Sequence, residues 1–159
     1  MEKLNLSVEQ WMRLINADND MPIPVWFQVV SNSMYPFIRA NRDRVTLVPA
    51  KAEALKKGDI VLFPVQRAGA VYCLHRIYRI DGDRVQTMGD ANRSPDGWIP
   101  KRDILGKAVM IRRGNLTIDC EKPEWAMAFG IWNAFWRIRP VMLLPFRVFG
   151  KCKRMIRKV

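Results

Sequence analysis

The chain has 159 residues, of which 49% are hydrophobic, so it is long enough to bury one core of its own. Its formal net charge is +12, and eight Lys and Arg residues but no acidic residue follow Glu124, which indicates an anionic partner for the C-terminal part. A single histidine and three cysteines without metal-ligand spacing exclude the usual His/Cys zinc site, and the odd cysteine count argues against a disulfide framework.

Residues 1–24 are predicted to form a short helix and an extended lead-in. Ser7 and Gln10 make the capping box of a helix over residues 7–17. The apolar residues of this helix share one face: Val8, Trp11, Met12 and Ile15. The segment has no apolar stretch of the kind found in signal peptides or membrane anchors, so neither is expected here.

Residues 25–118 are predicted to form a mainly β, curled antiparallel domain. Runs rich in β-branched and aromatic residues are typical of strands. They cover residues 25–30, 44–48, 60–63, 71–80, 84–88 and 104–111. Turn signals at Gly58-Asp59 and Asp81-Gly82, a hairpin-like connection over 64–70 and a polar loop over 89–97 separate these runs. Turns at such short intervals favour a single curled sheet.

The run 71–80 is the clearest strand, and its alternation assigns the side chains to two faces. His75, the only histidine, falls on the same face as Cys73, whereas Arg76 falls on the other. We interpret Cys73 as a buried strand cysteine in preference to a nucleophile. Arg76 is expected to pack or pair on its own face rather than to contact a substrate.

Residues 119–159 form an aromatic and basic tail that is predicted to be helical and amphipathic. The stretch 125–149 is long enough to span a membrane, but Arg137 and Arg139 at its centre each cost about 2.5–3.5 kcal/mol there. Aromatic side chains beside Lys and Arg are typical of a helix on an anionic lipid surface, so peripheral membrane association is predicted. Two alternatives stay open: a true span, and a core helix whose aromatic residues pack on the β domain (Trp125, Phe129, Trp132 and Trp136).

A serine-rich turn follows the first predicted strand, at residues 31–36 (SNSMYP). Pro36 has no N–H to donate and biases Tyr35 away from a helix, so the strand ends here. Such a turn holds the Ser33 hydroxyl at a fixed and accessible place. Taken alone, the segment is most simply interpreted as a structural turn.

The rest of the chain changes this interpretation, because His75 and then two aspartates, Asp90 and Asp96, follow Ser33 in order. A serine hydroxyl becomes an effective nucleophile when a base takes its proton, and a histidine near its ordinary pKa does so at neutral pH. An aspartate on the far ring nitrogen fixes the tautomer and stabilises the imidazolium. These residues are therefore candidates for a catalytic triad.

Four short boxes give a more specific signal. They are Ser-x-Ser-Met-x-Pro at 31–36, Gly-Asp-Ile-Val at 58–61, His-Arg-Ile at 75–77 and Gly-Asp-x-Asn at 89–92. Together they resemble the signal peptidase I family, in particular the histidine-based type of archaea and the endoplasmic reticulum. The resemblance covers roughly residues 25–111. It implies a serine endopeptidase acting on a leader, signal peptide or precursor, a fold related to LexA-like peptidases, and neither a cofactor, a metal nor a nucleic acid partner.

The resemblance also assigns roles to individual residues. Ser33 matches the nucleophile, His75 the general base, and Asp96 the aspartate that pairs with the histidine. Asp90 matches a second important acid, which pairs with His75 or braces its loop. The Ser31 hydroxyl and the Ser33 backbone N–H match the oxyanion donors, of which one is worth about 3–4 kcal/mol.

The chain departs from the family pattern in three ways. Asn32 stands where glycine is usual, which narrows the backbone freedom of the turn. The N-terminal transmembrane anchor typical of these peptidases is not recognised, and the large insertion of many bacterial enzymes is missing. In the family, an extended peptide with small residues before the cut adds along a strand edge. Whether this chain shares that preference is left open.

Two other functions compete with a peptidase. A LexA-like self-cleaving regulator has related boxes but uses a lysine base and carries a DNA-binding domain, for which the residues before Val30 leave no room. Ala68-Gly69 is the kind of bond that those proteins cut, but it lies in the predicted hairpin-like connection between the boxes. The other alternative is a non-catalytic module that binds peptide or membrane on the same scaffold, against which the intact Ser33 and His75 argue.

Overall fold

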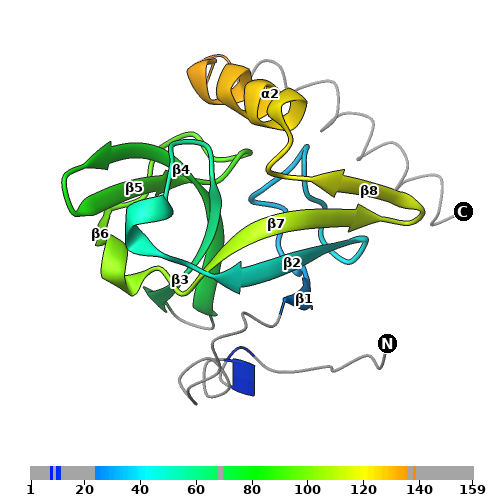
Figure 1. The fold of residues 1–159 in the computed structure, drawn as a ribbon, viewed down its shortest axis with the longest axis horizontal. Helices are drawn as coiled ribbons and strands as arrows, with labels where there is room; N and C mark the ends of the chain where they lie inside the picture. The colour runs from blue at the N-terminus through cyan, green and yellow to red at the C-terminus, as the bar shows by residue number, and fades with distance from the viewer. Residues whose placement is uncertain (1–7, 9, 12–23, 68–69, 136–137, 139–159) are drawn as a thin grey trace, which may run out of the picture.

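Eight antiparallel strands form one curled sheet in the computed structural model, which describes residues 8, 10–11, 24–67, 70–135 and 138 (Figure 1). The strand order is β1-β2-β7-β3-β4-β5-β6, and β8 pairs with β7 beside this path. The strands are β1 Val25–Gln28, β2 Asp43–Pro49, β3 Ile60–Arg67, β4 Ala70–Asp81, β5 Arg84–Met88, β6 Trp98–Pro100, β7 Gly106–Arg113 and β8 Leu116–Asp119. The mainly β fold class predicted from the sequence is confirmed.

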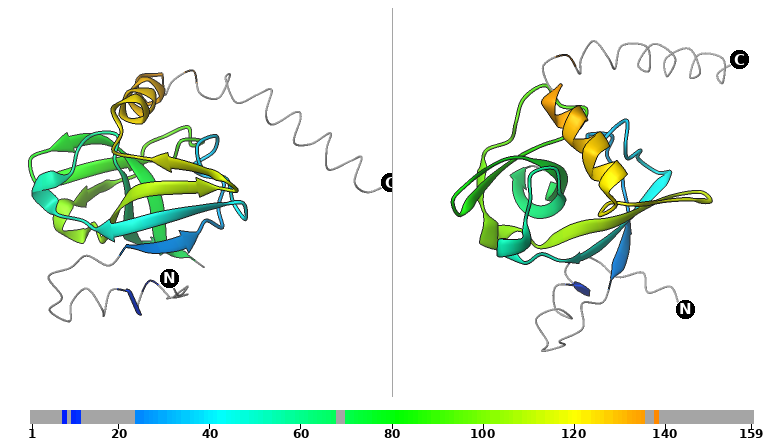
Figure 2. Two further views of the ribbon diagram at one scale, coloured as in Figure 1. Left: turned by 45° about the vertical axis from the view of Figure 1, so that its right-hand side comes forward. Right: turned by 45° about the horizontal axis from the view of Figure 1, so that its top comes forward.

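Helical structure lies in the connections, in the C-terminal part of the described chain and in a short segment near the N-terminus that includes residues 10–11. Two 3₁₀ turns cover Ala52–Ala54 (η1) and Lys101–Asp103 (η2), and the helix α2 covers Pro123–Ala134. Both figures of the whole fold show α2 lying across one end of the curled sheet, opposite the short helical segment that contains Trp11 (Figures 1 and 2). Most of the predicted helix 7–17 lies outside the described residues.

The observed strands differ from the predicted ones mainly at their ends. β3 continues through Pro64 to Arg67, where a short strand 60–63 was expected. The pairing register shifts between Pro64 and Arg67, and such an irregularity accommodates a residue that donates no backbone hydrogen bond.

The strands β6 and β8 were not predicted. β8 completes a hairpin whose turn, Gly114-Asn115, places Gly114 at a φ of 55°. The Ala68-Gly69 bond lies outside the described residues.

The core consists of two apolar clusters. The larger one combines residues of β1, β2, β3, β7 and β8 with Met34 of the serine turn, Ile38 shortly after it, and Phe129 of α2. The smaller one is centred on Val61, Phe63 and Ile77 of β3 and β4. β4 contributes to both, because Cys73 packs against the smaller cluster and Leu74 against the larger one. The predicted two-faced alternation of this strand is therefore present.

Helix α2 packs on the β domain along one side and is apolar on the other as well. Trp125, Phe129 and Trp132 lie on the inner side, as the core-helix alternative predicted. Large apolar side chains are exposed on the outer side and just beyond the helix: Met127, Ile131, Phe135 and Ile138. The prediction of an amphipathic helix is therefore wrong for α2. Trp136 and most of the stretch 125–149 after α2 lie outside the described residues.

A membrane-spanning helix is not found in the described part of the chain: no helix there has both the length and the apolar character needed to cross a bilayer.

The packing of the larger cluster predicts where the domain is most sensitive to truncation. Ile111 of β7 is buried and lies between Val45 and Ile118 of the neighbouring strands. We expect Ile111→Ala to lower the free energy of unfolding by about 2–5 kcal/mol, because it leaves a cavity in a closely packed site. Leu116→Ala, at a half-exposed position of β8, should change it by only about 0.5 kcal/mol. Urea unfolding followed by circular dichroism measures both values, and similar losses for the two variants would contradict this account of the core.

Candidate active site

A buried histidine–aspartate pair lies where β4 approaches the loop after β5. His75 Nδ1 and Asp96 Oδ2 are 2.6 Å apart, and the side chains are only 3% and 13% exposed. The Phe63 ring lies beside the imidazole, with 6.2 Å between the ring centroids. With Nδ1 engaged by the carboxylate, Nε2 is the nitrogen left to accept or donate a proton. Asp96, rather than Asp90, is therefore the aspartate that contacts His75.

Strand β5 holds Asp96 in place through three hydrogen bonds. The Asp96 amide donates to the Thr87 carbonyl at 2.8 Å, and the Gln86 side chain donates to the Asp96 carbonyl at 3.1 Å. The Thr87 hydroxyl donates to Asp96 Oδ2, the same oxygen that contacts His75, at 2.8 Å. Thr87 is a site residue that the sequence analysis missed. Only its place in a strand next to the acidic loop could have suggested it.

The environment of His75 favours the imidazolium. Burial alone disfavours the charged form, but the hydrogen bond to Asp96 and interactions with the Cys73 side chain outweigh it. The pKa of His75 is therefore raised from 6.5 to about 9. A base with this pKa is mostly protonated at neutral pH, so any reaction that needs neutral His75 becomes faster as the solution is made alkaline.

The serine turn docks on the other acidic segment, residues 89–92. The Ala91 amide donates to the Ser33 carbonyl at 2.8 Å. Gly89 lies so close that a Cβ there would come within 2.7 Å of the same Ser33 oxygen. Glycine is thus needed at this position for the two segments to approach. The contact brings the half-buried Ser33 to the segment that joins β5 to Asp96.

The predicted oxyanion groups are adjacent. The Ser33 amide donates to the Ser31 hydroxyl at 3.3 Å, so an incoming oxyanion would have to replace this hydrogen bond to use that N–H. The structure describes both Ser33 and His75, and no hydrogen bond joins the Ser33 hydroxyl to the imidazole. Catalytic hydrogen bonds are often long in an enzyme without substrate and tighten when it binds.

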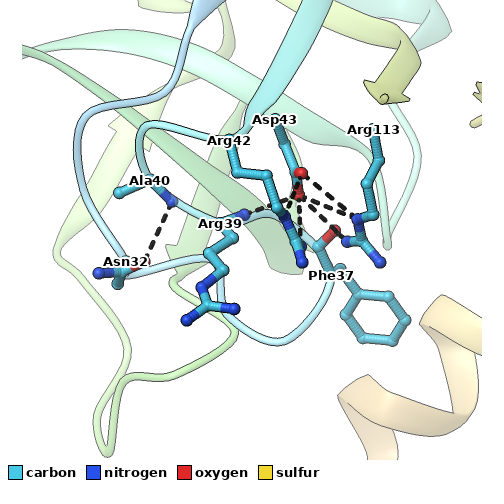
Figure 3. Close-up of polar contacts among 7 residues, drawn as sticks. All are labelled: Asn32, Phe37, Arg39, Ala40, Arg42, Asp43 and Arg113. Carbon is cyan, nitrogen blue, oxygen red and sulfur yellow. Dashed lines mark hydrogen bonds and ion pairs between the residues drawn. The ribbon is translucent and has the colours of Figure 1, made fainter. Parts of the chain in front are cut away.

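A network around Asp43 closes the serine loop, the segment 29–42 between β1 and β2 that carries Ser33 (Figure 3). Asp43 is fully buried, and its carboxylate accepts hydrogen bonds from the Arg42 and Arg113 guanidinium groups and from the Arg39 amide. Burial opposes its charge, but these hydrogen bonds outweigh that effect and lower the pKa of Asp43. Arg113 also donates to the Phe37 carbonyl at 2.6 Å. This network was not predicted, because its members lie up to 76 residues apart in the sequence.

Asn32, the departure from the family glycine, takes part in the same loop. Its side-chain oxygen accepts a hydrogen bond from the Ala40 amide at 3.0 Å (Figure 3). The asparagine therefore ties the two ends of the loop together, which a glycine in its place would not do.

Asp90 pairs with an arginine and not with His75. Arg76 Nε and Nη2 donate to the two Asp90 oxygens at 2.9 Å and 2.6 Å, and both side chains are almost fully buried. Arg76 also donates to the Gly58 carbonyl at 2.8 Å. This bidentate pair supports the interpretation in which Asp90 braces its loop, and it lies on the face of β4 opposite His75, as expected for Arg76.

Comparisons with known proteins leave the family open. No protein-family model, curated protein or solved structure matches the chain. The resemblance to signal peptidase I therefore stays a prediction that rests on the boxes themselves.

The His75–Asp96 pair predicts a measurable titration. As the chain has one histidine, NMR should show one set of imidazole signals, with a midpoint near pH 9. Asp96→Asn should lower this midpoint, since it removes the negative charge while burial remains. Because the folded-state pKa lies above 6.5, the pair stabilises the fold fully below about pH 6.5, and this contribution is lost as the pH rises through about 9. A wild-type midpoint near 6.5 would show that the pair does not form in solution.

Proposed function

We propose that this protein is a serine endopeptidase of the signal-peptidase type, with Ser33 as nucleophile and His75 as general base. The observation that carries the proposal is the 2.6 Å contact between His75 and Asp96, together with the hydrogen bond that joins Ser33 to Ala91 in the loop that carries Asp96. A histidine oriented by an aspartate beside an accessible serine is the arrangement that acyl transfer needs. The four sequence boxes give independent support.

The proposed reaction has two stages. In the first, the Ser33 hydroxyl attacks the scissile carbonyl while His75 Nε2 takes its proton, and the Asp96 carboxylate stabilises the resulting imidazolium. The imidazolium then protonates the leaving amine as the peptide bond breaks. In the second stage His75 activates a water molecule, which attacks the acyl-enzyme and releases Ser33. The Ser31 hydroxyl and the Ser33 amide stabilise the oxyanion in both stages.

An extended peptide is the substrate that the edge of the sheet favours. β1 pairs only with β2 among the described strands, and it leads directly into the serine turn. Val30, between β1 and Ser31, is 81% exposed. A peptide that paired with this edge as an additional β-strand would run alongside β1 and reach the serine turn, which carries the proposed nucleophile.

Labelling with a fluorophosphonate tests the proposed mechanism and separates a peptidase from a non-catalytic module. We expect the wild type to be labelled at Ser33, at a rate that rises with pH to a midpoint near 9 as His75 loses its proton. Ser33→Ala should abolish labelling and peptide cleavage without unfolding the domain. His75→Ala should abolish cleavage, and Asp96→Asn should lower its rate strongly, through loss of imidazole orientation.

Ser94→Ala is a matched control for the nucleophile, because Ser94 is an exposed serine of the neighbouring loop. It should be labelled and should cleave like the wild type. Substantial cleavage by purified Ser33→Ala or His75→Ala would overturn the mechanism.

Peripheral membrane association is the second part of the proposal. The outer side of α2 exposes apolar residues, among them Ile131 and Phe135, and the chain after Glu124 contains eight basic residues and no acidic one. Apolar contact and electrostatic attraction to anionic lipid add up on such a segment. The inner side of α2 belongs to the core, so removal of the tail after Cys120 would also expose the interior of the domain. Point substitutions on the outer side are the cleaner test.

Vesicle flotation of the full chain measures this association. We expect binding to vesicles with anionic lipid that fades in high salt, because the electrostatic part is screened. Ile131→Ser with Phe135→Ser should weaken binding, since each apolar side chain contributes about 1.5–3 kcal/mol when fully buried. Leu116→Ser, at an exposed apolar position of β8, should leave it unchanged. Binding that resists salt and carbonate would indicate a span, and no binding at all would exclude membrane association.

A further inference from the structure

Helix α2 contacts the loop that carries the proposed nucleophile. The Phe37 ring, four residues after Ser33, packs edge-on against Phe129, with 5.0 Å between centroids and an interplanar angle of 88°. It meets Trp132 in the same way, at 5.5 Å and 84°. In Figure 3 the Phe37 side chain points away from the Asp43 network and toward this helix. The network holds the backbone of the serine loop on one side, and α2 holds its apolar side chain on the other.

The same two residues of α2 contact the elements that carry His75 and Asp90. The Arg76 guanidinium, next to His75 in the chain, lies over the Phe129 ring at 4.0 Å from its centroid. The Trp132 indole N–H donates to the Asp90 carbonyl at 3.3 Å. Asn133, the following residue, donates to the carbonyl of Ile77 in β4 at 3.4 Å. The inner side of α2 thus contacts three elements: the serine loop, the strand β4 that carries His75, and the loop that carries Asp90.

We propose that Phe129 and Trp132 are positioning residues of the active site, which set the distance between Ser33 and the His75–Asp96 pair. This inference rests on the proposed peptidase function. The Ser33 hydroxyl and His75 are not hydrogen-bonded to each other, so their separation is determined by the contacts that bridge the elements carrying them. Beside the core packing of Met34, those contacts include the Ala91–Ser33 hydrogen bond and the packing of α2 on Phe37, Arg76 and Asp90. A displacement of about 1 Å in such a site costs on the order of a hundredfold in rate.

The buried Arg76–Asp90 pair fits this role. A buried ion pair contributes little to stability compared with apolar side chains of similar size, but it is satisfied in only one geometry. Asp90 accepts from Arg76 with both carboxylate oxygens and from Trp132 with its carbonyl, so the loop and the helix are held in one register. Ala91, whose amide donates to the Ser33 carbonyl, directly follows Asp90 in the chain.

Trp132→Phe is the most specific test, because it keeps an aromatic ring against Phe37 and removes the N–H that binds Asp90. Trp125→Phe is the matched control: it makes the same substitution on the same helix, at a side chain that packs on Phe129 and makes no hydrogen bond to residues 89–92 in the described structure. Three quantities are compared in the full-length protein. They are the exchange rate of the Ala91 amide hydrogen, the rate of fluorophosphonate labelling at Ser33, and the titration midpoint of His75.

For Trp132→Phe we expect Ala91 exchange to accelerate roughly threefold to tenfold, as the loop loses one hydrogen bond. Labelling of Ser33 should slow by up to about a hundredfold, with kcat of peptide cleavage falling and KM unchanged. The His75 midpoint should stay near 9, because the His75–Asp96 pair lies on the other face of β4. Trp125→Phe should match the wild type in all three measurements.

Two results would overturn the inference. One is a Trp132→Phe protein that equals Trp125→Phe in Ala91 exchange and in labelling. The other is a general loss of stability, in which all core amides exchange faster and labelling is normal below the unfolding temperature. If the wild type is not labelled at Ser33, the proposed peptidase function fails by itself. Ala91 exchange then still decides whether α2 positions the serine loop.

Discussion

The buried ion pair between Arg76 and Asp90 is the interaction on which the arrangement of the site depends. Arg76 connects β4 with the Gly58 turn, with the Asp90 loop and with the Phe129 ring of α2. Because both charges are almost fully buried, removal of either would leave the other without a partner in a medium where that is costly. Three segments that are distant in the sequence are therefore held in one arrangement, and the serine loop docks against two of them.

Strand β4 distributes the polar groups of the interior over its two faces. Successive side chains of a strand point in opposite directions, so His75 meets Asp96 on one face while Arg76 meets Asp90 on the other. Each basic side chain has its own carboxylate, and the two pairs do not compete. A third buried carboxylate, Asp43, is matched by Arg42 and Arg113 at the end of the serine loop. In a strongly basic chain, the buried acids thus have cationic partners that fix the loops around Ser33.

Much of the sheet was predictable, because strand alternation and turn residues are local signals. The hairpin of β4 and β5 turns at Gly82, whose φ of 52° suits the Asp81-Gly82 signal. The Gly114-Asn115 turn carries a similar signal, and it could have revealed β8. Other features had no local signal. β6 is only three residues long, and the continuation of β3 through Pro64 depends on an irregular pairing with β4. The tail as a whole was predicted to be amphipathic, but its basic residues follow α2 in the sequence, so the outer side of this helix carries none of them.

The candidate residues followed from local patterns in the sequence: the serine turn, the order Ser33, His75, Asp96, and the opposite faces of His75 and Arg76. A proline-containing turn, a strand period and four short boxes are each encoded within a few residues, so they can be recognised before the fold is known. The pairing of Asp96 with His75 and of Asp90 with Arg76, by contrast, depends on the folded arrangement. So do the positions of four further residues around the site: Thr87, Asp43, Arg113 and Trp132. These contacts join residues that are up to 70 positions apart, and their partners are chosen by how the sheet curls and where α2 packs, which no local pattern specifies.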